Sequence, residues 1–216
     1  MDKVNLDNIR QAFGNTVYNW KVHEVSAERL NIGAFWFKFF NILLVSLVLI
    51  VLFLQVVCLD NLAFKNYKDD LNCIGVILSV LEIILLISFL SFGFEERVSH
   101  HKKSALGFRN IRELYINLIT DTINNLDITK ITERRDALLR EFQTICNLSP
   151  QTSRASYRIA QNRLKPFIKK GFVNKYISFV FDLFSYKKIN DEDFTISDAE
   201  IDRFLPKRLQ KKNLEN

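Results

Sequence analysis

The stretch FFNILLVSLVLIVLFLQVVCL, from Phe39 to Leu59, contains no charged residue. At a helical rise of 1.5 Å per residue, its roughly 21 residues cover the hydrocarbon core of a bilayer, which is about 30 Å thick. A helix in the core of a soluble protein normally carries a polar face, and this stretch has none. We therefore predict a transmembrane helix over residues 39–59 and reject a buried helical hairpin of a soluble protein.

A second apolar run, LNCIGVILSVLEIILLISFLSFGF, extends from Leu71 to Phe94 and carries one charge, that of Glu82. It is also long enough to cross a bilayer. The residues between the two runs are too few to form a domain. We therefore predict an all-α membrane protein with a two-helix transmembrane hairpin, in which residues 71–94 form the second span and residues 60–70 an external loop.

The distribution of Lys and Arg predicts the orientation of this hairpin, because cytoplasmic flanks of membrane spans are enriched in these residues. The loop between the spans has two of them, and the flanks have eight: Lys65 and Lys68 in the loop, Lys21, Arg29 and Lys38 before the first span, and Arg97, Lys102, Lys103, Arg109 and Arg112 after the second. Both termini are therefore expected in the cytoplasm. The net charge of +6 is explained by these flanks, and no direct nucleic-acid binding is expected.

The predicted cytoplasmic part is helical. Residues 1–38 contain no proline and repeat apolar side chains every three to four positions, which indicates an N-terminal helix that runs straight into the first span. Residues 95–166 are predicted to form a helical hairpin or bundle whose first helix continues the second span. Within it, Asp127 and Thr129 are capping candidates for a helix that stops before Ser149 and Pro150.

The last two segments, residues 167–188 and 189–216, are predicted to have different roles. Residues 189–216 are expected to form a polar C-terminal helix and tail at the periphery, opened by a capping box from Ser197 to Glu200. Residues 167–188 combine aromatic and basic side chains, which suits either a helix in the inner headgroup layer or a core helix of the bundle. The headgroup interpretation assigns membrane contacts to Lys169, Lys170, Phe172, Lys175, Tyr176 and Phe179.

Glu82 is the residue of the spans with the strongest functional implication. It lies near the bilayer midplane, where an acidic side chain costs about 2.5–3.5 kcal/mol on insertion scales. Gly75 and Ser79 lie on the same helical face and allow close helix approach. The three residues are predicted to form an oligomer seam or pore wall, where a ring of carboxyl groups favours cations. The alternative is a single protonated Glu82 that is hydrogen-bonded to Ser46 or Gln55.

The remaining motifs exclude several classes of site. Cys58 and Cys73 fall at the external ends of the spans, where they can form a disulfide or serve as small apolar fillers. The pair His100 and His101 lacks the spacing of a helical metal site and is expected to face solvent or headgroups. The sequence contains no phosphate-binding glycine loop and no catalytic motif, so no metal, no cofactor and no enzymatic activity are expected.

The order of these features is more informative than any one of them. The segments AERLNIGAFWFKFFN, HHKKSALGFRNIRELYINLI and ERRDALLREFQTICNLSPQTSRASYRIA flank the spans. This layout, from about Trp20 to Lys165, resembles the SLATT family, the SMODS- and SLOG-associating two-transmembrane effectors of bacterial defence systems.

The resemblance implies a function. It implies an effector of the bacterial inner membrane that forms homo-oligomers and makes a pore or disrupts the bilayer, and so kills or arrests an infected cell. The implied trigger is a genomically linked sensor, either a nucleotide-signalling enzyme or a reverse transcriptase. The alternative is a membrane anchor without a pore, which docks a soluble partner at the inner membrane.

Overall fold

The structure is a computed structural model of the chain and describes residues 3–60, 67–124, 127–164 and 196–214. All regular elements within these ranges are helices, which confirms the predicted all-α fold. The chain divides into two units: residues 29–98, here called the hairpin unit, and residues 1–28 with 99–216, here called the bundle unit. The predicted contacts of the aromatic, basic segment 167–188 lie outside the described residues.

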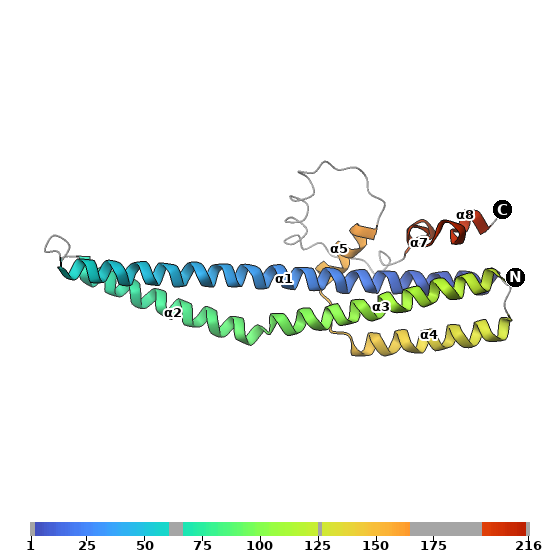
Figure 1. Cartoon of the computed structure of the whole chain (residues 1–216), viewed down its shortest axis with the longest axis horizontal. Helices are drawn as coiled ribbons and strands as arrows, with labels where there is room; N and C mark the ends of the chain where they lie inside the picture. The colour runs from blue at the N-terminus through green and yellow to red at the C-terminus, as the bar shows by residue number, and fades with distance from the viewer. Residues whose placement is uncertain (1–2, 61–66, 125–126, 165–195, 215–216) are drawn as a thin grey trace. The chain divides into compact units, whose positions relative to one another are not determined.

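Helix α1, Lys3–Asp60, contributes residues to both units (Figure 1). Its 58 residues correspond to about 87 Å of continuous helix. The chain has no proline before Pro150, so no residue in α1 lacks the backbone donor that the helix requires. One helix thus extends from the N-terminal residues through the first apolar stretch.

In the hairpin unit, α1 packs beside α2, Lys68–Phe92, and the start of α3, Phe94–Ile123. Gly93 separates the last two helices and has a φ of +53°, in the left-handed region that favours glycine. The backbone N–H of Arg97 donates to the Gly93 carbonyl at 3.1 Å, so α3 begins directly after Gly93. The predicted continuation of the second span into a further helix is therefore interrupted by one glycine.

The bundle unit contains most of α3 together with α4, Ile128–Leu148, and α5, Arg154–Leu164. The Asp127 carboxylate accepts a hydrogen bond from the Thr129 backbone N–H at 3.1 Å, as expected of the predicted cap. The C-terminal residues 196–214, here called the C-terminal clasp, form α7, Asp198–Phe204, then the 3-10 helix η3, Lys207–Leu209, and α8, Lys211–Leu214.

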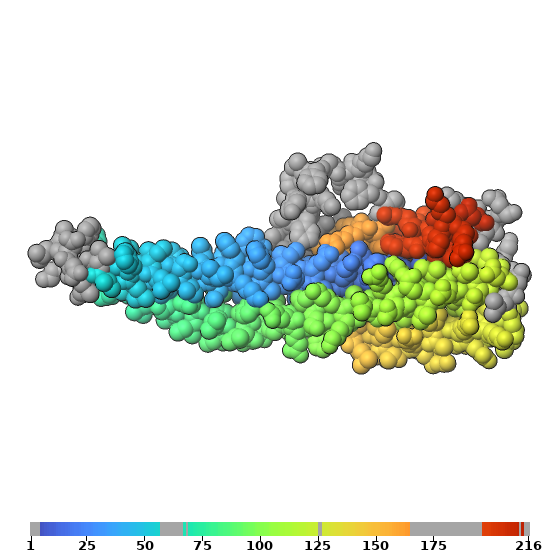
Figure 2. Space-filling model, in the orientation of Figure 1, coloured from blue at the N-terminus to red at the C-terminus, as the bar shows by residue number. Residues whose placement is uncertain are grey.

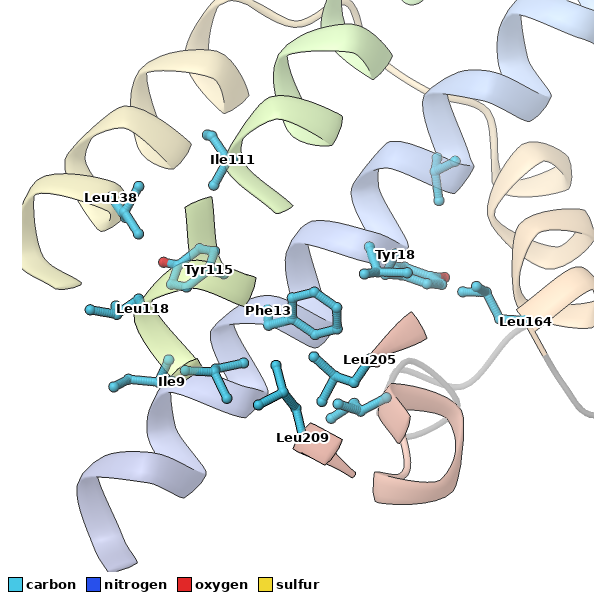
Figure 3. Packing of buried hydrophobic residues seen from close by; sticks show 14 of the residues in the cluster. Ile9, Phe13, Tyr18, Ile111, Tyr115, Leu118, Leu138, Leu164, Leu205 and Leu209 are labelled. Atoms are coloured by element: carbon cyan, nitrogen blue, oxygen red, sulfur yellow. The ribbon is translucent and has the colours of Figure 1, made fainter. Parts of the chain in front are cut away.

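The core of the bundle unit joins the N-terminal part of α1 to α3, α4, α5 and the C-terminal clasp. Figure 3 shows apolar side chains from these elements converging between the ribbons. Its buried members include Ile9 and Phe13 of α1, Ile111 and Tyr115 of α3, Leu138 of α4, Leu164 of α5, and Ile201, Leu205 and Leu209 of the C-terminal clasp. Burial of such side chains contributes roughly 1.5–3 kcal/mol each.

The expectation that the C-terminal residues are peripheral is wrong. Ile201, Leu205 and Leu209 are buried, and in Figure 2 the red atoms of this segment lie directly on the rest of the bundle. A Cβ atom at Gly14 would lie only 3.0 Å from the Ile201 side chain, so the glycine permits the close approach. The predicted capping box is present, because the Ser197 backbone N–H donates to Glu200 at 2.9 Å.

A buried arginine fixes the C-terminal clasp to α1. Arg10 is 1% exposed, and its guanidinium donates to the Asp202 carboxylate at 2.5 Å and to the Leu209 carbonyl at 2.9 Å. Asp202 also accepts the backbone N–H of Lys211 at 3.1 Å. A buried charge without a partner destabilises the folded state. The Asp202 carboxylate therefore stabilises the fold by pairing with the buried Arg10 guanidinium.

The expectation that His101 faces solvent or headgroups is also wrong. His101 of α3 and His23 of α1 are buried, and their Nδ1 atoms lie 3.0 Å apart. The His23 ring also stacks on Phe108 at 5.5 Å. Burial, and then the neighbouring His101, lowers the pKa of His23 from 6.5 to about 4, and burial lowers the pKa of His101.

Replacement of Asp202 tests the role of the buried ion pair. Asp202→Ala leaves the Arg10 guanidinium buried without its carboxylate and is expected to destabilise the bundle by about 2–3 kcal/mol. The thermal unfolding midpoint of the full chain in detergent measures the effect. Arg134→Ala is the control, since it removes an exposed ion pair with Asp121 and is expected to cost less than about 1 kcal/mol. Equal midpoints for the two variants would contradict this role.

The histidine pair predicts a pH dependence of stability. Between about pH 4 and 6.5 the unfolded chain binds more protons than the folded chain at His23, so the free energy of unfolding falls as the pH falls through this window. Unfolding midpoints measured from pH 7.5 to 4.5 are expected to decrease more in wild type than in His23→Asn. Arg134→Ala, at an exposed ion pair with Asp121 away from the histidines, is the control and keeps the wild-type slope. An unchanged slope in His23→Asn would refute the assignment.

Candidate functional site

The candidate site is the face on which α1 and α2 meet in the hairpin unit, here called the seam. At one end, the Phe37 ring lies 6.3 Å from Phe89 and 5.3 Å from Phe94, measured between ring centroids. At the other end, the Gln55 side-chain amide donates to the Leu71 carbonyl at 3.1 Å. These contacts establish an antiparallel pair.

The buried and half-buried residues of the two helices recur on one face of each at alternating spacings of three and four. This is the spacing of a left-handed helix pair. On α1 the seam comprises Phe37, Asn41, Leu44, Val48, Val51 and Gln55, and on α2 it comprises Leu71, Gly75, Leu78, Glu82, Leu85 and Phe89. Ser79 and Ser88 border it.

The faces away from the seam are exposed and apolar. They include Ile42, Phe53, Val76, Ile83 and Leu90. Among the described residues, two helices are long and apolar enough to cross a membrane, and within this chain almost none of their apolar stretches is buried. A core helix of a soluble protein would be covered on these faces, so hydrocarbon is the medium that suits them.

Gly75 allows the two helices to approach closely. A Cβ atom at this position would lie 3.2 Å from the Gln55 amide nitrogen and 3.4 Å from a methyl group of Val51. The Ser79 hydroxyl donates to the Gly75 carbonyl at 2.9 Å, within its own helix. The structure thus packs Gly75 against the first span of the same chain. The predicted role of Gly75 and Ser79 between copies or along a pore stays a prediction.

Glu82 lies half-buried on the same seam. Among the residues that the structure describes, its carboxyl group has no hydrogen-bond or ion-pair partner. Ser46 and Gln55, the two alternative partners predicted from the sequence, donate instead to the Ile42 and Leu71 carbonyls. Neither accounts for the carboxyl group, so the spans hold an acidic side chain without a bond to satisfy it.

Asn41 is a seam residue that was not predicted from the sequence. Its side-chain Oδ1 atom is buried and, within the described part of the chain, has no hydrogen-bond donor. Asn41 precedes Gln55 by two heptads, which places both amides on one face of α1. Two amides at this spacing in an otherwise uncharged stretch could have predicted a polar face on the first span. The seam therefore carries unsatisfied polar groups on both helices, Asn41 on α1 and Glu82 on α2.

The other predicted site residues are not brought to the seam by any described contact. Cys73 is exposed and is a free cysteine, and the side chain of Cys58 lies outside the described residues, so their disulfide stays a prediction. Lys169, Lys170, Phe172, Lys175, Tyr176 and Phe179 also lie outside the described residues. Within the described ranges, no three His, Cys, Asp or Glu side chains are grouped as metal ligands would be.

A comparison with protein-family models matches residues 6–174 to the family described as SMODS and SLOG-associating 2TM effector domain family 4. The match covers both helices of the seam and α3 to α5, and it ends before the C-terminal clasp. Neither the curated proteins nor the solved structures contain a match. The chain therefore belongs to the SMODS- and SLOG-associating two-transmembrane effector family, and it is a membrane protein with an effector domain associated with defence systems.

Proposed function

We propose that this chain oligomerises in the bacterial inner membrane and makes that membrane permeable when a partner sensor signals infection. The resulting loss of the ion gradients kills the cell or arrests its growth. Family membership supports the effector role, and the distribution of Lys and Arg around the spans supports a hairpin with both termini in the cytoplasm.

The observation that carries the proposal is the unpartnered carboxyl group of Glu82 on the seam. An acidic side chain in hydrocarbon is stabilised by a partner from another chain or by water, and residues of this kind mark ion pathways. A ring of such groups from several copies favours cations over anions. A helix that served only to tether the chain would gain nothing from Glu82.

The pathway proposed here is formed by the seam rather than by the outer faces. The outer faces offer mostly apolar side chains such as Ile83 and Leu90, which cannot hydrate an ion, and the exposed Ser46 hydroxyl donates to the Ile42 carbonyl of its own helix. The seam offers Asn41, Gln55 and Glu82. In the resting chain these groups are covered by the packing of α1 on α2, so the trigger must turn or separate the two helices and expose them to water and to neighbouring copies.

The proposed partner is a genomically linked sensor, either a nucleotide-signalling enzyme or a reverse transcriptase, which acts on the bundle unit. The bundle is suited to receive the signal because α1 and α3 continue from it into the hairpin unit. A change in the position of α1 in the bundle is thus carried by the same helix to the seam, whereas α3 is joined to the seam residues of α2 through Gly93.

A second candidate function is a membrane anchor without a pore, which docks a soluble partner. One observation favours it: Gly75 packs against the first span of the same chain, and the Ser79 hydroxyl donates to a carbonyl of its own helix. Both contacts are expected of a hairpin that needs no further copies. The two functions differ in their need for Glu82 and in their need for the seam to open.

Substitution of Glu82 tests the first difference. Glu82→Leu is expected to reduce the loss of membrane potential under activating conditions at least about tenfold, or about 1.4 kcal/mol in barrier height, because no acidic group remains on the pathway. Glu82→Gln keeps a hydrogen-bonding side chain and is expected to lie between Glu82→Leu and wild type. A membrane-potential dye in bacteria that express the chain with its genomic neighbours provides the measurement.

The matched control for Glu82 is Ile83→Leu, which changes an adjacent side chain on the lipid-facing surface. All variants are compared at equal amounts of protein in the membrane. If Glu82→Leu depolarises the cells as fast as wild type and Ile83→Leu, the carboxyl group is not on the pathway. If wild type itself leaves the potential intact under activation, the anchor function replaces the effector function.

A disulfide across the seam tests the second difference. Val51→Cys with Gly75→Cys, in a chain whose Cys58, Cys73 and Cys146 are replaced by Ser, places two thiols within bonding reach. Oxidation is expected to prevent depolarisation by holding α1 against α2, and a reductant is expected to restore it.

The two single-cysteine variants are the controls for this lock, and they are expected to respond to neither oxidant nor reductant. Full activity of the oxidised double variant, with the bond verified by its mobility in a gel, would show that the seam stays closed in the active state.

A further inference from the structure

Four aromatic residues form an exposed patch on α1 within the hairpin unit. Phe35, Trp36, Phe39 and Phe40, here called the aromatic collar, are between 46% and 62% exposed. They contact one another: the Trp36 ring lies 6.0 Å from Phe35, 5.7 Å from Phe39 and 5.9 Å from Phe40. The patch is therefore contiguous and faces away from the seam, where Phe37 lies instead.

The aromatic collar marks a change in the exposed surface of α1. Beyond it toward Asp60, the exposed large side chains are almost all aliphatic, from Ile42 to Val56. At the level of the collar, Lys38 forms an exposed ion pair with Glu95 at 2.7 Å. The Lys38 ammonium also lies 5.9 Å from the Phe89 ring. Charge and aromatic rings thus meet at one level, as they do where a membrane surface meets water.

The length of the apolar surface agrees with this placement. The Phe37 ring contacts Phe92, so the collar is level with the end of α2. From Phe92 back to Asp70, in the acidic first turn of α2, the helix extends about 33 Å at 1.5 Å per residue. The hydrocarbon core of a bilayer is about 30 Å thick, so the collar lies one bilayer thickness from the acidic end of the hairpin.

We propose that the aromatic collar binds the boundary between lipid headgroups and acyl chains and so fixes the depth of α1 in the bilayer. The indole of Trp36 has an apolar body and a polar N–H, which is the chemistry that this boundary selects. The occupant of the patch is therefore a lipid surface rather than a protein. The proposal rests on membrane insertion, which it shares with the proposed function, and not on the opening of a pathway.

The two tryptophans of the chain allow a direct test. Trp20→Phe leaves Trp36 as the single fluorophore of the full chain in lipid vesicles. Its fluorescence is measured with lipids that carry bromine near the headgroup and, separately, near the ends of the acyl chains, because bromine quenches indole only at short range. The expected result is a larger fluorescence loss with bromine near the headgroup.

Trp36→Phe leaves Trp20 as the matched control. Trp20 lies 16 residues earlier in the same helix, or about 24 Å along its axis, and packs against Phe204 and Arg112. Neither brominated lipid is expected to quench it.

Two results would overturn the proposal. Stronger quenching of Trp36 by bromine near the chain ends would place the collar inside the hydrocarbon, and no quenching by either lipid would place it outside the bilayer. Both results are independent of whether the vesicles become permeable, so failure of the collar and failure of the proposed function are separate outcomes.

Discussion

The packing of α1 on α2 is the interaction on which the rest of the structure depends. It gathers Asn41, Gln55, Ser79 and Glu82 on or beside one face and leaves the opposite faces apolar. Gly75 lets the two helices approach closely, since a Cβ atom there would lie 3.2 Å from the Gln55 amide nitrogen and 3.4 Å from Val51. In hydrocarbon, water cannot compete for polar groups, so contacts between these side chains hold the hairpin together. The same packing keeps them away from the lipid-facing surface.

The C-terminal clasp is the second constraint, and it acts on the other end of α1. Residues 196–214 lie beyond the family match, yet they supply core residues and the carboxylate that Arg10 requires. Burial of an arginine against one short segment makes the association of that segment with α1 nearly obligatory in the folded chain. This family member therefore completes its bundle with residues that the family match does not include.

Much of the fold was predictable from local sequence. The two uncharged or nearly uncharged stretches predicted the hairpin, and Asp127 and Ser197 predicted the starts of two helices, because the length of a span and the chemistry of a cap are local properties. The burial of the C-terminal residues was missed because their polar composition hid the spacing of Ile201, Leu205 and Leu209, which are four residues apart. The helix break at Gly93 was missed because a glycine in an apolar run does not reveal its own φ.

The candidate site was predictable only in part. Gly75, Ser79 and Glu82 could be placed on one face from helical periodicity alone. Their contacts with Val51 and Gln55 depend on the pairing of the two helices, which periodicity does not set. His101 illustrates the same limit, since its partner His23 is distant in the sequence and is brought to it by the packing of α3 on α1.

The most direct test of the account is the water accessibility of the seam before and after activation. Ser79→Cys, in a chain whose other cysteines are replaced by Ser, is exposed in bacteria to a thiol reagent that cannot cross the membrane or dissolve in it. The account predicts no labelling in resting cells and rapid labelling once the potential collapses, with Val76→Cys on the lipid-facing surface unlabelled in both states. Collapse of the potential while Ser79→Cys stays unlabelled would contradict a pathway formed by the seam.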